Sequence, residues 1–295
     1  MFTRLDHVTI AVPDLQQGIA QYTKMGFNVH AAGIHPGRGT HNAVAFNTED
    51  YLELLAIRDP AEYTASRAPG ATGSSLDVFI AQGGGIRQIA VQSDDLEADV
   101  AGMRSRGIDV GDAVEGGRRT PDGQELRWKT AVLGAKNPLP IFFIQHLTSL
   151  ETRRTQVPGG GAHPNGVYKL ERSYIVSRDA GNEAATYARV LGMEKPELHK
   201  GTVVMSHMAI FEIGPTGLGV VQPYAPGPAA EALERRGPGP FQALYRTTSM
   251  GAAARWMQEH GMPPPTRGVR SNGEQAMLAT PEYTCGAYIG FVGPE

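Results

Sequence analysis

The sequence predicts an α+β protein in which four β-α-β-β-β modules pair into two domains with curved mixed sheets. One order of apolar runs recurs four times, and a helix-period segment ending at a glycine follows the first run of every module. The 37 glycines and 21 prolines lie in short clusters between these runs, as turns do. The length of 295 residues suits about two domains. We expect domains over 1–150 and 165–295, built from modules 1–80, 81–150, 165–235 and 236–295.

The first module opens with an apolar run over 5–12, which predicts a strand. A helix follows over 13–27, because the segment starts with Pro-Asp and its apolar periodicity stops at Gly26. Three more strands are predicted over 27–33, 41–46 and 51–57.

The other three modules repeat this order. The second has a strand over 85–91, a helix over 94–108 and strands over 125–133 and 140–147. The third has a strand over 169–177, a helix over 180–193 and strands over 203–213 and 218–223. The fourth has a strand over 240–247, a helix over 250–262 and strands over 274–280 and 287–292. Residues 146–167 are polar, Gly-rich and without period, and predict a linker between the halves.

Counting back from the glycine that ends each helix gives the register of the first strands. A position 19 residues before that glycine is occupied by His7, Gln88, Ser173 and Gln242 in the four modules. In the third module, a slip of one residue would replace Ser173 with Arg172 and reverse the face of each side chain.

Composition excludes several classes of protein. The chain has 27 Lys and Arg against 30 Asp and Glu, a formal charge of −3, so no net basic field attracts nucleic acid. The single cysteine, Cys285, cannot form an intramolecular disulfide and fits a reducing compartment. The N-terminus lacks the features of a secretory signal, and no apolar stretch is long enough to span a membrane. We expect a cytoplasmic protein.

Side chains from the first and last strands should meet on the concave side of each sheet. Alternation places His7 and Glu53 there in the first module, and Gln88 and Gln145 in the second, unless a slip turns His146 inward instead. Imidazole, carboxylate and amide oxygen suit a divalent ion such as Fe, Mn, Co, Ni, Zn or Mg. The alternative is that His7 is a hydrogen-bonded core residue and that Glu53 is an edge carboxylate paired with an arginine.

Two loops carry further candidates. The segment 34–44 contains Arg38, His41 and Asn42, where His41 is a candidate general base and Arg38 a candidate partner for a substrate carboxylate. The alternative is a solvated turn. Segment 116–128 contains Arg118 and Arg119 and ends with Arg127 and Trp128, which we favour as substrate-binding residues because they begin a strand.

The segments LDHVTIAVPDL, HPGRGTHNAV and YLELLAI resemble the glyoxalase-like branch of the vicinal oxygen chelate superfamily. TPDGQELRWKTAV and LPIFFIQHL resemble its second module, whereas residues 165–295 match only the general module pattern. The resemblance implies one divalent metal ion held between paired modules, and its ligand positions carry over to His7, Glu53, Gln88 and Gln145. Many relatives have an acidic residue at the position of Gln145, and an amide cannot accept a proton as their carboxylate does.

We therefore expect a metal-dependent lyase or isomerase acting on a small oxygenated substrate, with Glu53 and His41 as catalytic residues and Arg38, Asn42, Arg127 and Trp128 binding substrate. One alternative is an extradiol-type dioxygenase, in which His146 supplies a second imidazole. The other is a small-molecule binding or resistance protein. The second half offers no carboxylate or imidazole in its last strands, so we expect it to complete the fold rather than bind a metal ion. A homodimer is compatible with this architecture.

Overall fold

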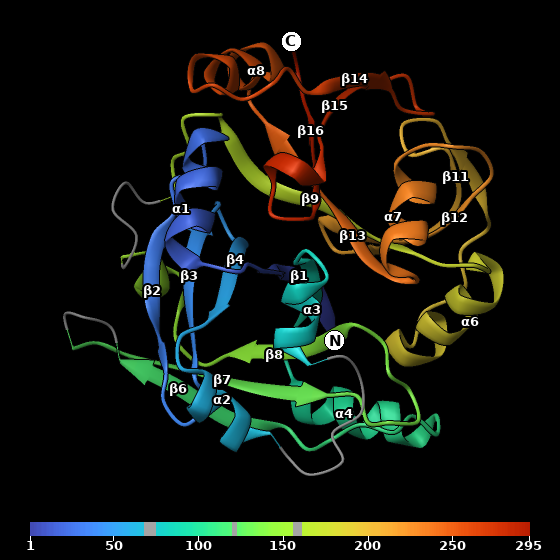
Figure 1. Ribbon diagram of the computed structural model, residues 1–295. Coiled ribbons are helices and arrows are strands. Elements are labelled where there is room, and N and C mark those ends of the chain that lie inside the picture. The colour runs from blue at the N-terminus through green and yellow to red at the C-terminus, as the bar shows by residue number, and fades with distance from the viewer. Residues whose placement is uncertain (68–74, 120–122, 156–160) are drawn as a thin grey trace.

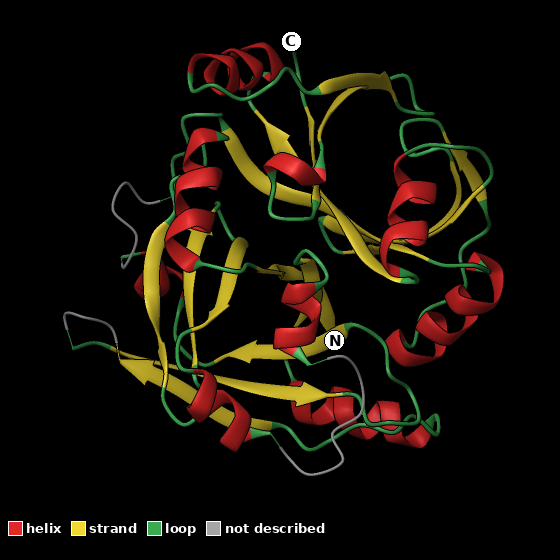
Figure 2. Cartoon of the chain, viewed as in Figure 1, coloured by secondary structure: helices red, strands yellow, loops and turns green. Residues whose placement is uncertain are grey.

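A computed structural model describes residues 1–67, 75–119, 123–155 and 161–295 of the chain, and they form two curved sheets of eight strands each (Figures 1 and 2). The strand orders are β2-β3-β4-β1-β5-β8-β7-β6 and β10-β11-β12-β9-β13-β16-β15-β14. Each sheet joins two modules through their antiparallel first strands. The predicted α+β architecture of paired β-α-β-β-β modules is confirmed.

The first half contains the strands β1 (Phe2–Ala11), β2 (His30–His35), β3 (Thr40–Phe46), β4 (Tyr51–Ile57), β5 (Gly85–Ser93), β6 (Val114–Arg119), β7 (Glu125–Val132) and β8 (Ile141–His146). Its helices are α1 (Leu15–Lys24), α2 (Pro60–Ser66), α3 (Leu76–Ala81), α4 (Leu96–Ser105) and α5 (Leu150–Arg154). Among these, α2, α3 and α5 lie outside the predicted pattern, as does β6, which is a short polar edge strand.

The second half contains the strands β9 (Val167–Val176), β10 (His199–Gly201), β11 (Ser206–Ile213), β12 (Thr216–Pro223), β13 (Gly239–Thr247), β14 (Thr266–Val269), β15 (Gln275–Ala279) and β16 (Tyr288–Val292). Its helices are α6 (Ala180–Leu191), α7 (Pro228–Arg236), α8 (Met250–Glu259) and the 3₁₀ turn η1 (Pro281–Tyr283). The edge strands β10 and β14 lie outside the predicted pattern.

A shared helix cap explains why the four modules start their main helix at the same point. In each module, a short polar side chain accepts a hydrogen bond from the backbone N–H three residues later, and these caps are Asp14, Asp95, Asp179 and Ser249. Such a cap stabilises a helix by about 1 kcal/mol. The caps lie seven residues after His7, Gln88, Arg172 and Gln242. Arg172, rather than Ser173, therefore occupies the position of His7 in the third module.

A bulge at the same point of each first strand fixes this register. Asp6, Arg87, Glu171 and Phe241 are the extra residues, each directly before the position of His7. The last strand of each module runs parallel to the first, and its register places Glu53, Phe142, Gly219 and Gly290 at matching points. The glycine count misplaces the third module because Gly192 lies 13 residues after the cap Asp179, whereas the matching glycine lies 12 residues after the cap in the other three modules.

Both sheets curl until their edge strands meet. In the first sheet, the Arg118 guanidinium on β6 donates to the carbonyl oxygen of Ala32 on β2 at 2.7 Å. In the second, the Thr202 hydroxyl beside β10 donates to the carbonyl oxygen of Val269 on β14. The concave face of each sheet is thereby partly enclosed.

The two halves pack through a shared aromatic core. Phe27 lies 5.3 Å from Tyr245 and 6.2 Å from Phe291, measured between ring centroids. The buried hydroxyl of Tyr22 donates to the carbonyl oxygen of Thr284 at 3.0 Å. The core is therefore continuous across the two sheets.

The segment predicted to link the two halves contacts the first half. It contains α5, while residues 156–160 lie outside the described residues. His163 is buried and binds the backbone N–H of Asn28 and the side chain of Asn47. Asn165, fully buried, donates to the carbonyl oxygen of Met25 at 3.1 Å.

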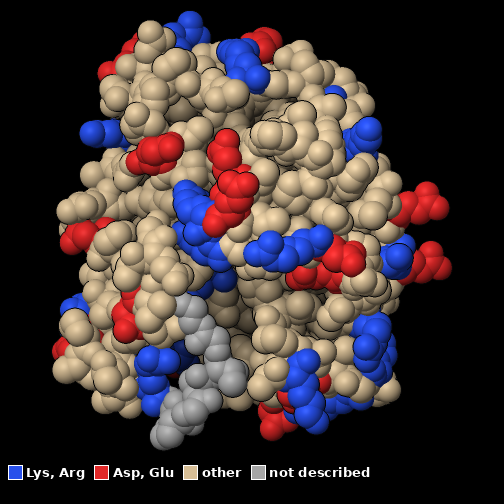
Figure 3. Space-filling view, turned by 45° about the vertical axis from the view of Figure 1, so that its right-hand side comes forward, with Lys and Arg blue, Asp and Glu red and all other residues tan. Residues whose placement is uncertain are grey.

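On the surface shown in Figure 3, basic and acidic side chains lie beside one another over much of the face. Among the described residues, no helix combines the length and apolar character that crossing a bilayer requires.

Candidate functional site

His7 and Glu53 lie together on the concave face of the first sheet. The His7 Nε2 atom is 3.7 Å from Glu53 Oε2, and His7 is only 3% exposed. Their strands are adjacent and parallel, with Thr9 opposite Glu53 in the register. The alternation of side chains predicted this meeting, and the structure brings the two residues together.

Asp6 fixes the orientation of His7. Because Asp6 is the bulge residue, its side chain turns to the same side as that of His7. The Asp6 Oδ2 atom forms a hydrogen bond of 2.7 Å with His7 Nδ1. The Nε2 lone pair is then available toward Glu53. Simple alternation assigns Asp6 to the opposite face from His7, so the sequence pattern alone does not place it at the site.

The same carboxylate also holds His146. Asp6 Oδ1 lies 2.8 Å from His146 Nε2, and the Arg153 guanidinium of α5 lies 3.2 Å from that nitrogen. Asp6 is completely buried. Burial alone raises the pKa of Asp6, but its interactions with His146 and His7 outweigh that effect and hold the pKa well below its usual range.

Glu53 is held by two neutral donors. The Thr9 hydroxyl donates to Oε2 at 2.8 Å and the Asn42 amide donates to Oε1 at 2.6 Å. Asn42 is 7% exposed, and its Oδ1 atom is buried without a hydrogen-bond partner. The site therefore has an unfilled acceptor that suits a ligand hydroxyl, a water molecule or a cation.

Aromatic rings enclose the His7 imidazole. The Tyr51 ring stacks on it with centroids 4.3 Å apart, and the Phe142 ring meets it edge-on at 5.5 Å. Phe142 occupies the position in the second module that matches Glu53 in the first. The apolar ring of Phe142 therefore lies at the position where we expected Gln145 to supply the fourth metal ligand.

Gln145, which we expected there, lies on the other face of β8. Its amide oxygen accepts from the backbone N–H of Leu96 at 3.2 Å, and its amide nitrogen donates to the carbonyl oxygen of Asp94 at 2.7 Å. Both contacts anchor the start of α4. The alternative register considered from the sequence, with His146 turned inward, is the one observed.

Gln88 lies opposite Thr9 on β5 and lines a cavity of about 450 Å³ between the two halves. Arg236 lines the same cavity, with its guanidinium 4.5 Å from the centroid of the Phe79 ring. Burial, with Arg235 nearby, lowers the pKa of Arg236 to about 10.

His41 and Arg38 do not lie beside Glu53 and its hydrogen-bond donors Thr9 and Asn42. His41 follows Thr40 on β3 and precedes Asn42, so it lies on the opposite face of the strand from Asn42. Burial lowers the pKa of His41, as does the nearby charge of Arg58. Arg38 is exposed in the turn between β2 and β3.

His35 is the histidine of this hairpin that lies on the Glu53 side. It faces Thr40 across the hairpin, and its Nδ1 atom is 2.8 Å from the Thr40 hydroxyl. Burial lowers the pKa of His35, and the charge of Glu53 opposes that change. Thr40 lies two residues before Asn42, so both project to one face.

Trp128 pairs with His146 in the register of β7 and β8 and shares its face. Arg127 projects the other way, is exposed and forms an ion pair with Glu115 at 2.6 Å. Arg118 also lies near the cluster: burial lowers its pKa, and the neighbouring Tyr51 and Glu53 oppose this.

The donor set fits a divalent ion at two of the four expected positions. The described residues contain no group of three His, Cys, Asp or Glu side chains placed to hold a metal ion. Of the expected ligand positions, the structure brings the His7 imidazole and the Glu53 carboxylate within 3.7 Å of each other. The extradiol alternative needs a second imidazole: His146 Nε2 lies 2.8 Å from Asp6 Oδ1, and His146 Nδ1 is buried without a hydrogen-bond partner.

Paired β-α-β-β-β modules that curl around a concave face define the vicinal oxygen chelate superfamily, as the sequence resemblance implies. The chain belongs to the glyoxalase-like domain family, whose model matches residues 5–191. No protein with a curated description matches it.

Solved structures share the fold over nearly the whole chain. A hypothetical protein from Staphylococcus aureus is 14% identical with a TM-score of 0.68, covering 98% of both chains. A mutant of 4-hydroxymandelate synthase from Streptomyces coelicolor is 13% identical with a TM-score of 0.62, covering 100% of this chain and 94% of the other. A fusion of a xylose isomerase-like TIM barrel with 4-hydroxyphenylpyruvate dioxygenase is 10% identical with a TM-score of 0.60, covering 99% of this chain and 49% of the other.

Proposed function

We propose that the first half is the active site of a metal-dependent lyase or isomerase that acts on a small oxygenated organic molecule. The observation that carries the proposal is the approach of His7 Nε2 to Glu53 Oε2 at 3.7 Å, with His7 locked by Asp6. Two ligands with bonds of about 2.1 Å can share one ion at this separation. The ion would act as a Lewis acid on two neighbouring substrate oxygens.

The surrounding residues have separate tasks. Asp6 keeps the Nε2 atom of His7 unprotonated, and Thr9 and Asn42 hold the two oxygens of Glu53 in place. Tyr51 and Phe142 exclude water from the imidazole. The oxygen of Asn42 without a partner accepts from a substrate hydroxyl.

We assign the proton transfer to His35 in place of His41. His35 lies on the Glu53 side of the β2–β3 hairpin, whereas His41 lies on the other side. Burial favours its neutral form, which is the form that accepts a proton. Arg118 and Trp128 are the better-placed substrate contacts, since Arg38 and Arg127 are exposed.

The proposal is tested by titrating Co²⁺ into the protein that has been stripped with a chelator. We expect His7→Ala and Glu53→Gln each to weaken binding at least tenfold, since each removes one of two protein ligands. His207→Ala is the matched control: this histidine lies on β11 of the second half, beside Tyr224, and its loss leaves the affinity unchanged. Equal affinity in all three variants would exclude this site.

A second candidate function is small-molecule binding without a metal ion. The observation that favours it is Phe142, an apolar ring at the position where the fourth ligand is expected. In that case the chelator-stripped protein binds its ligand as well as the untreated protein does. Co²⁺ then has no measurable affinity for the His7 and Glu53 pair.

A further inference from the structure

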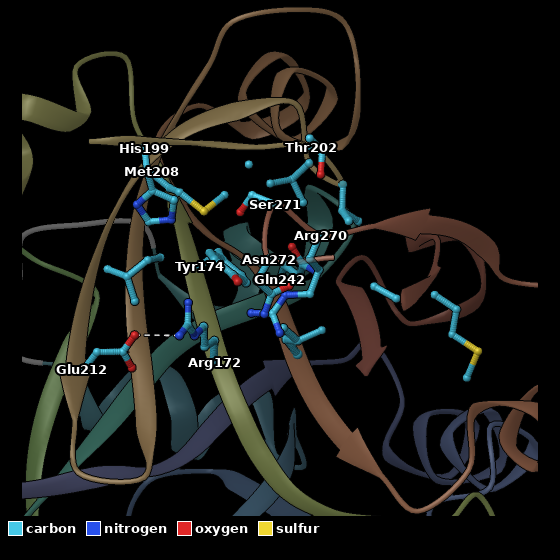
Figure 4. Close-up of a pocket in the computed structure, with 17 residues that line it drawn as sticks. Arg172, Tyr174, His199, Thr202, Met208, Glu212, Gln242, Arg270, Ser271 and Asn272 are labelled. Carbon is cyan, nitrogen blue, oxygen red and sulfur yellow. Dashed lines mark hydrogen bonds and ion pairs between the residues drawn. The ribbon is translucent and has the colours of Figure 1, made fainter. Parts of the chain in front are cut away.

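The second sheet encloses a cavity of about 270 Å³ that is unrelated to the His7 and Glu53 pair. It lies on the concave face of the second half, and Figure 4 shows side chains from β9, β10, β11 and β13 projecting toward it. It is large enough for a small organic molecule.

Two glycines leave room for Tyr174 and Gln242, two side chains that line this cavity. Gly219 and Gly290 occupy the positions that Glu53 and Phe142 hold in the first half. A Cβ atom at Gly219 would lie 2.5 Å from the Tyr174 ring, and one at Gly290 would lie 2.8 Å from the Gln242 amide nitrogen. Tyr174 and Gln242 therefore use the space that a carboxylate and a ring fill in the other sheet.

The charged lining is basic on balance. Arg172 and Arg270 line the cavity, against one carboxylate, Glu212. Arg172, at the position of His7, donates to Glu212 at 2.6 Å through Nη2, and this ion pair is drawn in Figure 4. Glu212 has a side chain that is 60% exposed, so water weakens its hold on the guanidinium.

Arg270 is anchored from outside the cavity. Its Nη1 atom donates to Glu274 and lies 3.9 Å from Glu171, and neither carboxylate lines the cavity. Arg246 binds both of these carboxylates and orients them. The guanidinium of Arg270 is thereby held rigidly at the cavity wall, as a binding group for an anion requires.

Gln242 offers an unused acceptor inside the cavity. It is 2% exposed, lines the cavity, and its Oε1 atom has no hydrogen-bond partner. Leaving such a buried group unpaired destabilises the protein. A ligand hydroxyl would satisfy it.

Apolar side chains form part of the remaining wall, beside the polar side chains of His199, Thr202, Ser271 and Asn272. Val203, Met208, Ile210, Leu244 and Met277 line it, and Met208 and Ile210 are buried. An apolar ligand body fits against these side chains, whereas a fully polar ion does not use them.

We propose that the second half binds a small hydroxy-substituted carboxylic acid with an apolar body. The carboxylate pairs with Arg270 and Arg172, the hydroxyl donates to Gln242 Oε1, and the apolar body packs against β11 and β15. This site is separate from the proposed metal site and does not depend on it.

Calorimetry with three probes on the full-length wild-type protein tests the ligand chemistry. The probes are 2-hydroxy-4-methylpentanoate, its amide, and 4-methylpentanoate, which lacks the hydroxyl. We expect the hydroxy acid to bind about tenfold more tightly than either of the others, because each lacks one polar contact. Equal affinity for the acid and its amide would overturn the proposal, as would absence of binding by all three.

Variants locate the binding to this cavity. Arg270→Gln should remove the preference for the acid over the amide, and Gln242→Met should remove the preference for the hydroxyl. Arg267→Gln is the matched control, since Arg267 lies on the same hairpin, is exposed and pairs with Glu295. If Gln242→Met keeps the preference for the hydroxyl, the site lies elsewhere. Should Arg270→Gln fail to fold, the probe series and Gln242→Met still decide.

Discussion

Asp6→Asn is the substitution that most sharply tests the hydrogen-bond network around His7. The wild-type carboxylate is fully buried and binds His7 on one oxygen and His146 on the other. Asparagine has the same shape, but it presents an amide group to one of the two imidazoles. That imidazole must then change tautomer or lose its partner. Breaking a buried charge network of this kind costs about 3–5 kcal/mol of unfolding free energy.

The substitution also changes the pH dependence of stability. The pKa of Asp6 is lower in the folded protein than in the unfolded chain, whose carboxyl titrates near 3.8. Its contribution is therefore present above pH 3.8 and decreases as the pH falls toward the lower folded value. The stability advantage of the wild type over Asp6→Asn should shrink over the same acid range.

Metal affinity provides the functional measurement. If the new amide group faces His7, the Nδ1 atom of His7 must accept its hydrogen bond, so the proton of the imidazole moves to Nε2. The protonated Nε2 atom of His7 can then no longer bind a metal ion. We expect Co²⁺ affinity to fall about 10- to 100-fold, as losses of a carboxylate behind a ligating histidine do.

Urea unfolding and Co²⁺ titration of the same preparations measure both effects. The matched control is Asp179→Asn, because Asp179 is an exposed cap of α6 and asparagine caps a helix equally well. A loss of less than about 1 kcal/mol in Asp6→Asn would refute the network as a source of stability. Unchanged Co²⁺ affinity would refute its role behind His7.

Three further predictions follow from buried groups. Burial raises the pKa of Asp50 from 3.8 to about 7, so its protonated form stabilises the fold below pH 4 and the benefit is lost as the pH rises to 7. Asp50→Asn should remove this dependence, on the order of 4 kcal/mol, in urea unfolding at pH 4 and pH 7; parallel curves for both proteins would contradict it. Gly219→Ala places a methyl group against Tyr174 and should cost about 1–3 kcal/mol and weaken hydroxy-acid binding, and no change in either would show that the ring moves freely. Phe143→Ala removes a buried ring stacked at 4.8 Å on Phe2 and should cost about 3–5 kcal/mol in the same assay, whereas a neutral result would mean that the sheet repacks.

The repeat of apolar runs predicted the architecture because each module must bury the same faces. Alternation along 5–12 and 51–57 was sufficient to bring His7 and Glu53 to one face. The short edge strands β6, β10 and β14 were missed because they are paired on one side only and lack a long apolar run.

Residues near bulges and strand ends were harder to place. Asp6 joins His7 because a bulge interrupts the alternation, and no local composition marks it. The shift from Gln145 to Phe142 arises because the register of β8 is set by its pairing with β5. The helix caps did carry usable information, since counting seven residues back from Asp179 gives Arg172, whereas the glycine count gives Ser173.

We propose above all that His7 and Glu53 bind one metal ion together, and diffraction from crystals soaked in Co²⁺ locates such an ion directly. An anomalous difference map at the cobalt absorption edge should show a peak about 2.1 Å from both His7 Nε2 and Glu53 Oε2. A peak bound to other residues, or an ordered crystal with no peak between these two atoms, would contradict the claim.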